Sequence, residues 1–294
     1  MKNLAITGLV AAGLALSAPA KAQDGGSYIL ATASTGGTYY PVGVAIATLT
    51  KVRLEPSTGI GMSAVSSAGS GENVRLLREG EAQFGILQGL FGYYARSGTG
   101  PIEEDGPQEH LRSVSLLWPN VEHWVIDDEH VETGTFSDFL TIVGEPAALG
   151  RQNSGTIGSN AAILDGFGVN LYEDFQLVEG GYGPSAEALQ NGQVEGISTP
   201  AGDPVGAISQ LMAAAGDSVS ILDFTDEELE KNVSTVTDIA GMKQGKLNQP
   251  LRVALTGVTV GAGIYETMTV LGREKVLTRL DYARENYCAA GGAE

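Results

Sequence analysis

The chain has 294 residues, a formal net charge of −18 and 43% hydrophobic residues. Its hydrophobic content is enough for a sizeable core, and its length allows one large or two medium domains. A charge this negative argues against binding to nucleic acid or to anionic membrane surfaces. The one cysteine, Cys288, excludes an internal disulfide and a cysteine-based metal site.

The first 22 residues have the pattern of a secretory signal peptide. Lys2 supplies the positive start, the apolar stretch 4–18 is too short to cross a membrane, and Ala20-Lys21-Ala22 is a small-x-small cleavage site. We therefore expect cleavage near Ala22. The product is expected to be an exported protein, most simply bacterial and periplasmic, with no direct membrane insertion.

A glycine-rich loop follows the first expected strand, Tyr28 to Ala31. The sequence S-T-G-G-T-Y-Y-P-V-G runs from Ser34 to Gly43 and leads into an expected amphipathic helix. Such a loop can present backbone N–H groups and a positive helix end to an anion, or it can be an ordinary turn. It matches neither the phosphate-binding nor the dinucleotide-binding glycine pattern. The candidate contacts in it are Thr35, Gly36, Gly37, Thr38, Tyr39 and Tyr40.

A second unit of the same kind runs from Ile60 to Leu87. Its expected strand ends at Ser66, a small-residue loop follows, and Ser70 is placed to cap a helix that ends at Gly80. The next strand is expected over 84–87, and Gln88 directly follows its C-terminal end. Polar groups at strand C-termini line the crevice of open α/β sheets, so Gln88 is either a ligand contact or a surface amide.

The middle of the chain contains two tryptophans, a histidine and a carboxylate close together. Residues 97–110 are expected to form a surface loop, and strands are expected over 111–118 and up to Ile126. The group from Trp118 to Trp124 indicates core packing beside a polar turn, or else an aromatic wall of a cleft. His110 and His130 lack metal-ligand spacing, so no metal site is expected.

The third glycine- and hydroxyl-rich loop, 150–156, precedes a helix with an apolar face. Arg151 is the one cation in the three loops; it could pair with a ligand carboxylate, although a residue at this position more often points into solvent. Further elements are expected in chain order: strands 146–149 and 175–178, helix 185–191, strand 194–198, a helix containing Val205 and Leu211, strand 219–224, helix 226–231, strand 253–260 and a largely helical segment 265–287.

Alternating strands and helices predict an α/β fold. Three loops of the same composition suggest that they converge on one polar site between two lobes.

At this point the chain resembles the TAXI-type solute-receptor subunits of tripartite ATP-independent periplasmic (TRAP) transporters. The resemblance covers residues 28–222. Its motifs, in order, are G-G-T-Y-Y-P-V-G at 36–43, G-S-G-E-N at 69–73 with Gly80-Glu81, Gln88, Trp118-Pro119 with His123, Ser154-Gly155-Thr156, Glu187-Ala188-Leu189 with Gly192, and Gly202-x-Pro204. The family's larger residue before Glu72 is Gly71 here, its I-D-A is Val194-Glu195-Gly196, and the match after Lys231 is poor.

The resemblance implies a two-lobed type II periplasmic-binding-protein-like fold with a ligand cleft between the lobes. Lobe one would comprise residues 27–120 and 225–294, and lobe two residues 121–224, with crossings near 118–126 and 221–224. The implied function is capture of a small organic acid or acidic amino acid, similar to glutamate or 2-oxoglutarate, for delivery to a membrane-embedded, ion-driven TRAP permease. We expect a monomer without a cofactor.

The site implied by the loops and the resemblance is for binding, and no catalytic residue is expected. It consists of Thr35, Gly36, Gly37, Thr38, Tyr39, Tyr40, Ser70, Asn73, Gln88, Trp118, Ser154, Gly155, Thr156 and Asp203. Two alternatives stay open. One is a receptor of the same fold that serves a sensor or an ABC permease. The other is an exported serine hydrolase using Ser70 or Ser154, although neither lies in G-x-S-x-G.

Overall fold

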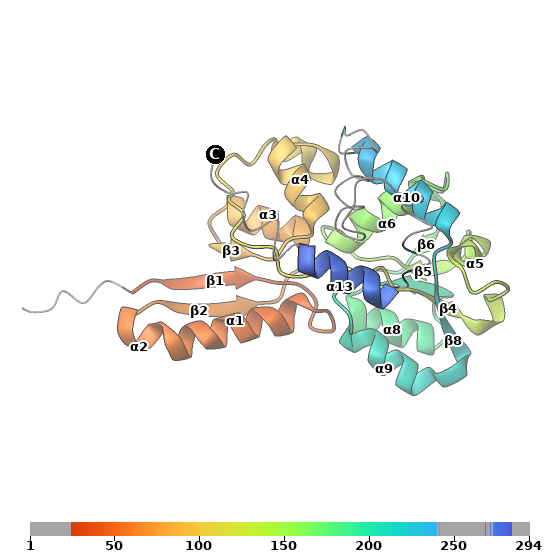
Figure 1. Cartoon of the computed structure of the whole chain (residues 1–294), viewed down its shortest axis with the longest axis horizontal. Coiled ribbons are helices and arrows are strands. Elements are labelled where there is room, and N and C mark those ends of the chain that lie inside the picture. The colour runs from red at the N-terminus through yellow and green to blue at the C-terminus, as the bar shows by residue number, and fades with distance from the viewer. Residues whose placement is uncertain (1–24, 240, 242–267, 269–270, 272, 284–294) are drawn as a thin grey trace, which may run out of the picture.

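Two β-sheets, one in each half of the molecule, organise the computed structural model, which describes residues 25–239, 241, 268, 271 and 273–283 (Figure 1). The smaller sheet has the order β2-β1-β3 and is parallel throughout. The larger has the order β6-β5-β7-β4-β8, and its β4 runs antiparallel to both neighbours. We call the half built on the smaller sheet lobe one and the other half lobe two. The expected α/β class and two-lobed arrangement are confirmed.

The strands are β1 Ser27–Ala31, β2 Gly61–Val65, β3 Phe84–Gly85, β4 Trp124–Asp127, β5 Pro146–Ala148, β6 Gln176–Leu177, β7 Gly196–Ser198 and β8 Val219–Leu222. The α-helices are α1 Tyr39–Arg53, α2 Glu55–Thr58, α3 Ser70–Arg78, α4 Gly89–Ser97, α5 Phe136–Phe139, α6 Gly155–Asp165, α7 Leu171–Asp174, α8 Tyr182–Gln190, α9 Gly206–Ala215, α10 Asp226–Ile239 and α13 Arg273–Ala283. Short 3-10 helices are η1 Gly100–Asp105, η2 Asp128–His130, η3 Leu140–Ile142 and η4 Gly216–Ser218. None of the helices described here is both long enough and apolar enough to cross a bilayer.

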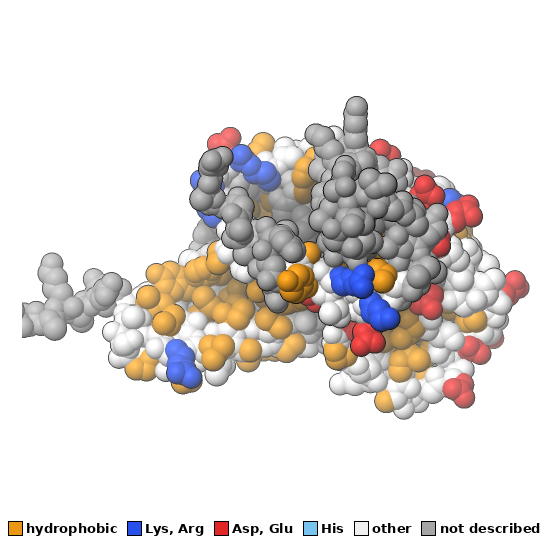
Figure 2. All heavy atoms as spheres, viewed as in Figure 1, with side chains coloured by type: hydrophobic (Ala, Val, Ile, Leu, Met, Phe, Trp, Pro, Cys, Tyr) orange, Lys and Arg blue, Asp and Glu red, His pale blue; other side chains and the backbone are white. Residues whose placement is uncertain are grey.

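In lobe one, helix α1 lies close against the sheet because a glycine faces it. A Cβ atom on Gly43 would lie 2.4 Å from the Thr32 side chain, so a larger residue here would force the helix away. The opposite face of α1 leaves Leu49 and Val52 exposed. Figure 2 shows hydrophobic side chains gathered over this part of lobe one, whereas acidic side chains gather around lobe two.

Lobe two buries both faces of its sheet. On one face Trp124 is fully buried, with ring centroids 4.8 Å from Phe136 and 4.7 Å from Phe139, both edge-on. Helices α8 and α9 cover the other face through residues such as Leu189 and Leu211. Aromatic pairs in this geometry add to the stabilisation from burial. For Trp124, the core-packing interpretation is confirmed.

The strand predicted over residues 111–118 is wrong. The structure assigns no regular secondary structure there, and Val114 and Leu116 are 83% and 73% exposed. Leu111, at its start, packs against the lobe-one cluster around Phe91 and Tyr94. The alternating apolar pattern predicted a strand, but within the described residues no neighbouring strand pairs with it.

Helix α10 extends to Ile239, eight residues beyond its predicted end at Lys231. It begins with a capping box, in which Thr225 N–H donates to Glu228 Oε2 at 2.7 Å and Glu228 N–H donates to Thr225 Oγ1 at 3.3 Å. Glu228 also accepts from Ser137 Oγ, and Lys231 Nζ lies 5.1 Å from the centre of the Phe167 ring. These contacts are with lobe two, whereas the sequence placed residues from 225 onward in lobe one.

Several expectations fall outside the described residues: the signal peptide over 1–22, the strand over 253–260 and part of the helix over 265–287. Helix α13 is the longest described part of that last segment. The sequence did not predict helices α2, α4, α5 and α7. The exact residue boundaries of the two lobes remain a prediction.

Replacing Asp138 by alanine is expected to destabilise lobe two by about 2 kcal/mol, because three backbone N–H donors in part-buried hydrogen bonds lose their acceptor. The carboxylate accepts from the backbone N–H groups of Glu132, Thr133 and Gly134. Burial opposes ionisation, but these hydrogen bonds outweigh it and lower the pKa of Asp138. Its stabilisation is therefore present at neutral pH and lost as pH falls through that lowered pKa. Urea midpoints at pH 7 and pH 3 test this, with Asp217→Ala as an exposed control.

Candidate ligand-binding site

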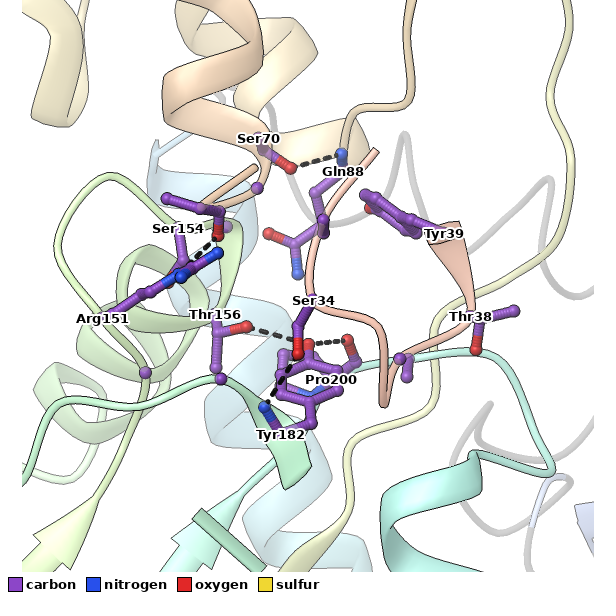
Figure 3. A pocket seen from close by; sticks show the side chains of 18 of the residues that line it. Ser34, Thr38, Tyr39, Ser70, Gln88, Arg151, Ser154, Thr156, Tyr182 and Pro200 are labelled. Carbon is purple, nitrogen blue, oxygen red and sulfur yellow. Dashed lines mark hydrogen bonds between the residues drawn. The ribbon is translucent and has the colours of Figure 1, made fainter. Parts of the chain in front are cut away.

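A pocket lies between the lobes, where the carboxyl ends of parallel strands of both sheets meet (Figure 3). It encloses about 500 Å³ of space when its open mouth is included. Its lining comes from the loops after β1, β2 and β3 and from those after β5, β6 and β7. The lining residues are Ala33, Ser34, Gly37, Thr38, Tyr39, Ala68, Gly69, Ser70, Gln88, Asn120, Gly150, Arg151, Ser154, Gly155, Thr156, Gly180, Gly181, Tyr182, Pro200 and Ala201.

Five helices begin at this pocket: α1, α3 and α4 from lobe one, and α6 and α8 from lobe two. Each places the positive end of its dipole at the pocket. In α6, Ser154 is the N-cap residue, and its Oγ accepts from Ile157 N–H at 3.1 Å. Together the helix ends favour an anion in the pocket.

Arg151 is the only charged side chain among the described residues that line the pocket. Its guanidinium donates to the backbone carbonyl of Ser67 and, through Nε at 3.5 Å, to that of Ala68. The interpretation that Arg151 points into solvent is therefore wrong. It links lobe two to lobe one and adds positive charge at the pocket wall.

Two tyrosines place phenol groups in the wall. Tyr182 donates to the Pro200 carbonyl at 2.7 Å, and its hydroxyl also lies 2.9 Å from Thr156 Oγ1. Burial raises the pKa of both Tyr39 and Tyr182, so both phenols are neutral at physiological pH. The Tyr39 ring packs edge-on against Trp118, with centroids 5.7 Å apart.

The lobes are in contact around the pocket. Ser34 Oγ accepts from Tyr182 N–H at 3.2 Å, and Thr38 Oγ1 accepts from Gly202 N–H at 3.0 Å. The Glu72 N–H also donates to the Asn153 carbonyl at 3.0 Å, across the lobes. These bonds describe a closed arrangement, because separating the lobes would break them all.

The structure brings together eight of the predicted site residues. Gly37, Thr38, Tyr39, Ser70, Gln88, Ser154, Gly155 and Thr156 all line the pocket. Thr35, Gly36, Tyr40 and Asn73 do not line it, and Trp118 and Asp203 line a neighbouring groove beside α13.

Two of the predicted site residues, Asn73 and Ser70, make hydrogen bonds that hold the protein's own backbone in place. The Asn73 amide is fully buried and donates to the carbonyls of Thr32 and Ile86 at 2.6 and 2.8 Å. Ser70 is not the expected cap, since Gly69 holds that position. Its Oγ instead accepts from Gln88 N–H at 2.9 Å, which ties two pocket loops together.

The sequence did not single out Ser34, Asn120, Tyr182, Pro200 or Ala201 as contacts. For Tyr182 a signal existed: Gly180-Gly181-Tyr182-Gly183-Pro184 follows a strand and opens a helix, as the first loop does. The order of residue types is similar to that of the Gly-Gly-Thr-Tyr-Tyr-Pro loop at 36–41. In both loops the glycines come before an aromatic residue, and a proline lies in the first turn of the helix that follows.

The profile of the NMT1-like family matches residues 30–242, more than two thirds of the chain. A second profile, the anticodon binding domain, matches residues 206–284. Consistent with that, the glutamate--tRNA ligase of Streptomyces griseus is 41% identical over 83 residues, which cover 28% of this chain and 16% of the ligase. A glutamate--tRNA ligase of Rhodospirillum centenum is 48% identical over 81 residues, with the same shares of each chain. The matched part thus spans about a sixth of these relatives.

Solved structures of similar layout include binding proteins. The Escherichia coli periplasmic aliphatic sulphonate binding protein has a TM-score of 0.39 and 13% identity, covering 87% of this chain and 78% of that one. A binding protein component of an ABC phosphonate transporter from Pseudomonas aeruginosa has a TM-score of 0.44 and 12% identity, covering 90% and 97%.

Proposed function

Since this chain belongs to the NMT1-like family, we propose that it is a periplasmic solute-binding receptor for a small carboxylate. In this proposal it is of the TAXI type and delivers the ligand to an ion-driven TRAP permease. Binding would stabilise the closed arrangement of the lobes. A receptor of the same fold for a sensor or an ABC permease is the alternative, and the genes beside its own distinguish the two.

The observation that carries the proposal is the polarity of the pocket. Five helix N-termini and Arg151 face it, and no carboxylate occurs among the described lining residues. The overall charge of −18 repels anions, so this local field is what would attract one.

The same geometry disfavours an exported serine hydrolase. The Oγ atoms of Ser70 and Ser154 each accept a hydrogen bond from a backbone N–H. His123 Nδ1 lies 3.0 Å from the Thr199 carbonyl, and the described pocket lining contains no histidine that could serve as a base.

The direct test is thermal unfolding of the protein, refolded to remove any ligand, against organic acids, amino acids and sugars. A ligand specific for the folded state stabilises it by about 2.7 kcal/mol at a hundredfold excess over its dissociation constant. A selective shift with a carboxylate supports the proposal. A shift with a neutral compound alone would overturn it.

Two substitutions of Ser154 separate helix capping from anion binding. Both Ser154→Thr and Ser154→Asp keep a side-chain acceptor at the α6 N-cap, so each variant is expected to stay within about 1 kcal/mol of wild-type stability. Aspartate also places a negative charge on the pocket wall. We therefore expect affinity for a carboxylate to fall at least tenfold in Ser154→Asp and to change little in Ser154→Thr, measured by calorimetry. Equal affinities would contradict an anion site here.

A second candidate function, tRNA binding by residues 206–284, rests on the match to the anticodon binding domain. This candidate runs against the expectation, drawn from the net charge, that the protein has no nucleic-acid partner. Residues 240–294 contain seven Lys or Arg and five Asp or Glu. Residues 1–239 contain ten Lys or Arg and 30 Asp or Glu. The acidic start of α10, Asp226 to Glu228, would repel phosphate, so only the segment after it has a suitable balance.

Fluorescence anisotropy with labelled glutamate tRNA tests this candidate. Binding that weakens steeply with salt, and that weakens further in Lys275→Ala on α13 but not in Lys51→Ala on α1, would support it. Equal effects of the two substitutions would indicate non-specific attraction.

A further inference from the structure

The end of β4 and the start of β7 bring one histidine and two glutamates together on lobe two. His130 closes the short helix η2 that follows β4, and Glu195 directly precedes β7. The two segments meet because β4 runs antiparallel to β7, with Ile126 paired to Gly196. The parallel strands β5 and β7 begin at this edge of the sheet, so it lies opposite the pocket, which is at their carboxyl ends.

The imidazole of His130 faces both carboxylates. Its Nε2 atom lies 3.1 Å from Glu195 Oε2 and 3.6 Å from Glu129 Oε1. One donor atom from each of the three residues lies within 4.8 Å of the other two. A tetrahedral Zn²⁺ ion with bonds of about 2.0–2.2 Å separates its ligand atoms by about 3.4 Å. The two distances from Nε2 bracket this value, so the imidazole already has the spacing that such an ion requires from each carboxylate.

Backbone hydrogen bonds hold the two segments in place. The backbone of Glu195 donates to the Pro146 carbonyl at 2.8 Å and accepts from Asp127 N–H at 3.0 Å. The Asp127 side chain in turn accepts from Glu129 N–H at 3.0 Å, which fixes the start of η2. The side chains of His130 and Glu195 are 27% and 28% exposed, whereas that of Glu129 is 73% exposed. A metal ion here would therefore have two half-buried ligands and one adaptable ligand, with a coordination position open to water.

Hydrogen bonding alone leaves this cluster incompletely satisfied. The Nε2 atom of His130 carries at most one hydrogen atom, so it cannot donate at full strength to both carboxylates. Among the residues that the structure describes, no Lys or Arg forms an ion pair with Glu129 or Glu195. Two ionised carboxylates this close repel each other. A divalent cation cancels both charges and binds the imidazole in its neutral form.

The ligand set indicates the class of metal. One imidazole nitrogen with two carboxylate oxygens suits Zn²⁺, whereas Ca²⁺ and Mg²⁺ prefer oxygen ligands alone. We propose that Glu129, His130 and Glu195 form a Zn²⁺ site on lobe two, separate from the ligand pocket. The ion ties η2 to the start of β7 and so stabilises this edge of the sheet. In the sequence, His130 lacks metal-ligand spacing because Glu195 lies 65 residues further along the chain.

Calorimetry with ZnCl₂ on the full chain, first treated with a chelator, tests this site. We expect His130→Gln and Glu195→Gln each to weaken Zn²⁺ binding by about tenfold or more, since even the loss of a group that only supports a metal ligand costs this much. His110→Gln and Glu187→Gln make the same chemical changes at exposed positions outside the cluster, and both should bind as the wild type does. CaCl₂ should bind the wild type more weakly than ZnCl₂ by about tenfold or more.

Urea unfolding separates loss of the ion from misfolding. Without metal, His130→Gln and Glu195→Gln should each stay within about 1 kcal/mol of wild-type stability, as is usual for surface ion pairs. Saturating ZnCl₂ should raise the urea midpoint of the wild type and of both control variants, but not of these two variants. Unchanged Zn²⁺ affinity in either variant would overturn the proposal. Ca²⁺ binding as tight as Zn²⁺ binding would also overturn it, because that result would indicate attraction to an acidic surface alone.

Discussion

Gly71→Ala is expected to weaken ligand binding at least tenfold without harming the fold. Gly71 is the second residue of α3, and a Cβ atom there would lie 2.8 Å from the Asn153 carbonyl oxygen across the lobes. That oxygen belongs to the backbone and also accepts from Glu72 N–H at 3.0 Å. The lobes must therefore separate by several tenths of an ångström, which opposes closure on the ligand.

The same change should favour helix α3 itself, because alanine is a better helix former than glycine by up to about 1 kcal/mol. Affinity and stability are thus expected to move in opposite directions, a result that general misfolding would not produce. Gly92→Ala is the matched control, since it lies in α4 of the same lobe with nothing within 4 Å of its Cβ position. Calorimetry and urea unfolding measure both quantities. Wild-type affinity in Gly71→Ala would mean that closure at this contact is not coupled to binding.

Glu122→Gln is expected to stabilise the protein by about 3 kcal/mol at pH 8. Burial raises the pKa of Glu122 to about 7, so the folded state holds its proton more tightly than the unfolded chain does. Between the unfolded pKa of about 4.3 and a pH of about 7, stability falls as pH rises, because the folded state binds more protons. Each unit of pKa difference corresponds to about 1.4 kcal/mol.

Urea unfolding without ligand measures the free energy of unfolding of the variant and of the wild type at each pH. The quantity to follow is the difference between these two free energies as a function of pH. The difference should be small near pH 4, grow up to about pH 7 and then stay constant. Glu187→Gln removes the same charge from an exposed position and should give no such rise. A difference that does not change with pH would show that the Glu122 carboxyl is hydrated in the folded protein.

Local pattern predicted the strand–loop–helix units well. Apolar periodicity marked β1 with α1 and β5 with α6, and glycine with hydroxyl residues marked the loops between them. Because the carboxyl ends of parallel strands meet along one edge, these loops could be assigned to a common site before any contact was known. That is why Thr38, Gln88 and Ser154 were found.

The errors arose where partners distant in sequence decide the outcome. The alternation in residues 111–118 suits a strand, but a strand also requires a neighbour. Asn73 looked like a ligand contact because it lies in a motif, whereas the carbonyls of Thr32 and Ile86 occupy its amide. Arg151 was assigned to solvent because its carbonyl acceptors lie more than 80 residues earlier in the chain.

The exposed segment 112–117 has a consequence for how the protein behaves at high concentration. Where such a segment is extended, its backbone N–H and C=O groups are available to a strand of another molecule, and the bare side chains of Val114 and Leu116 add an apolar surface for it. These features favour strand pairing between the exposed segments of two copies. The net charge of −18 on each chain opposes this association, because the copies repel each other. High salt screens that repulsion, so concentrated samples are best kept at low ionic strength, and a lysine at position 114 or 116 would discourage assembly.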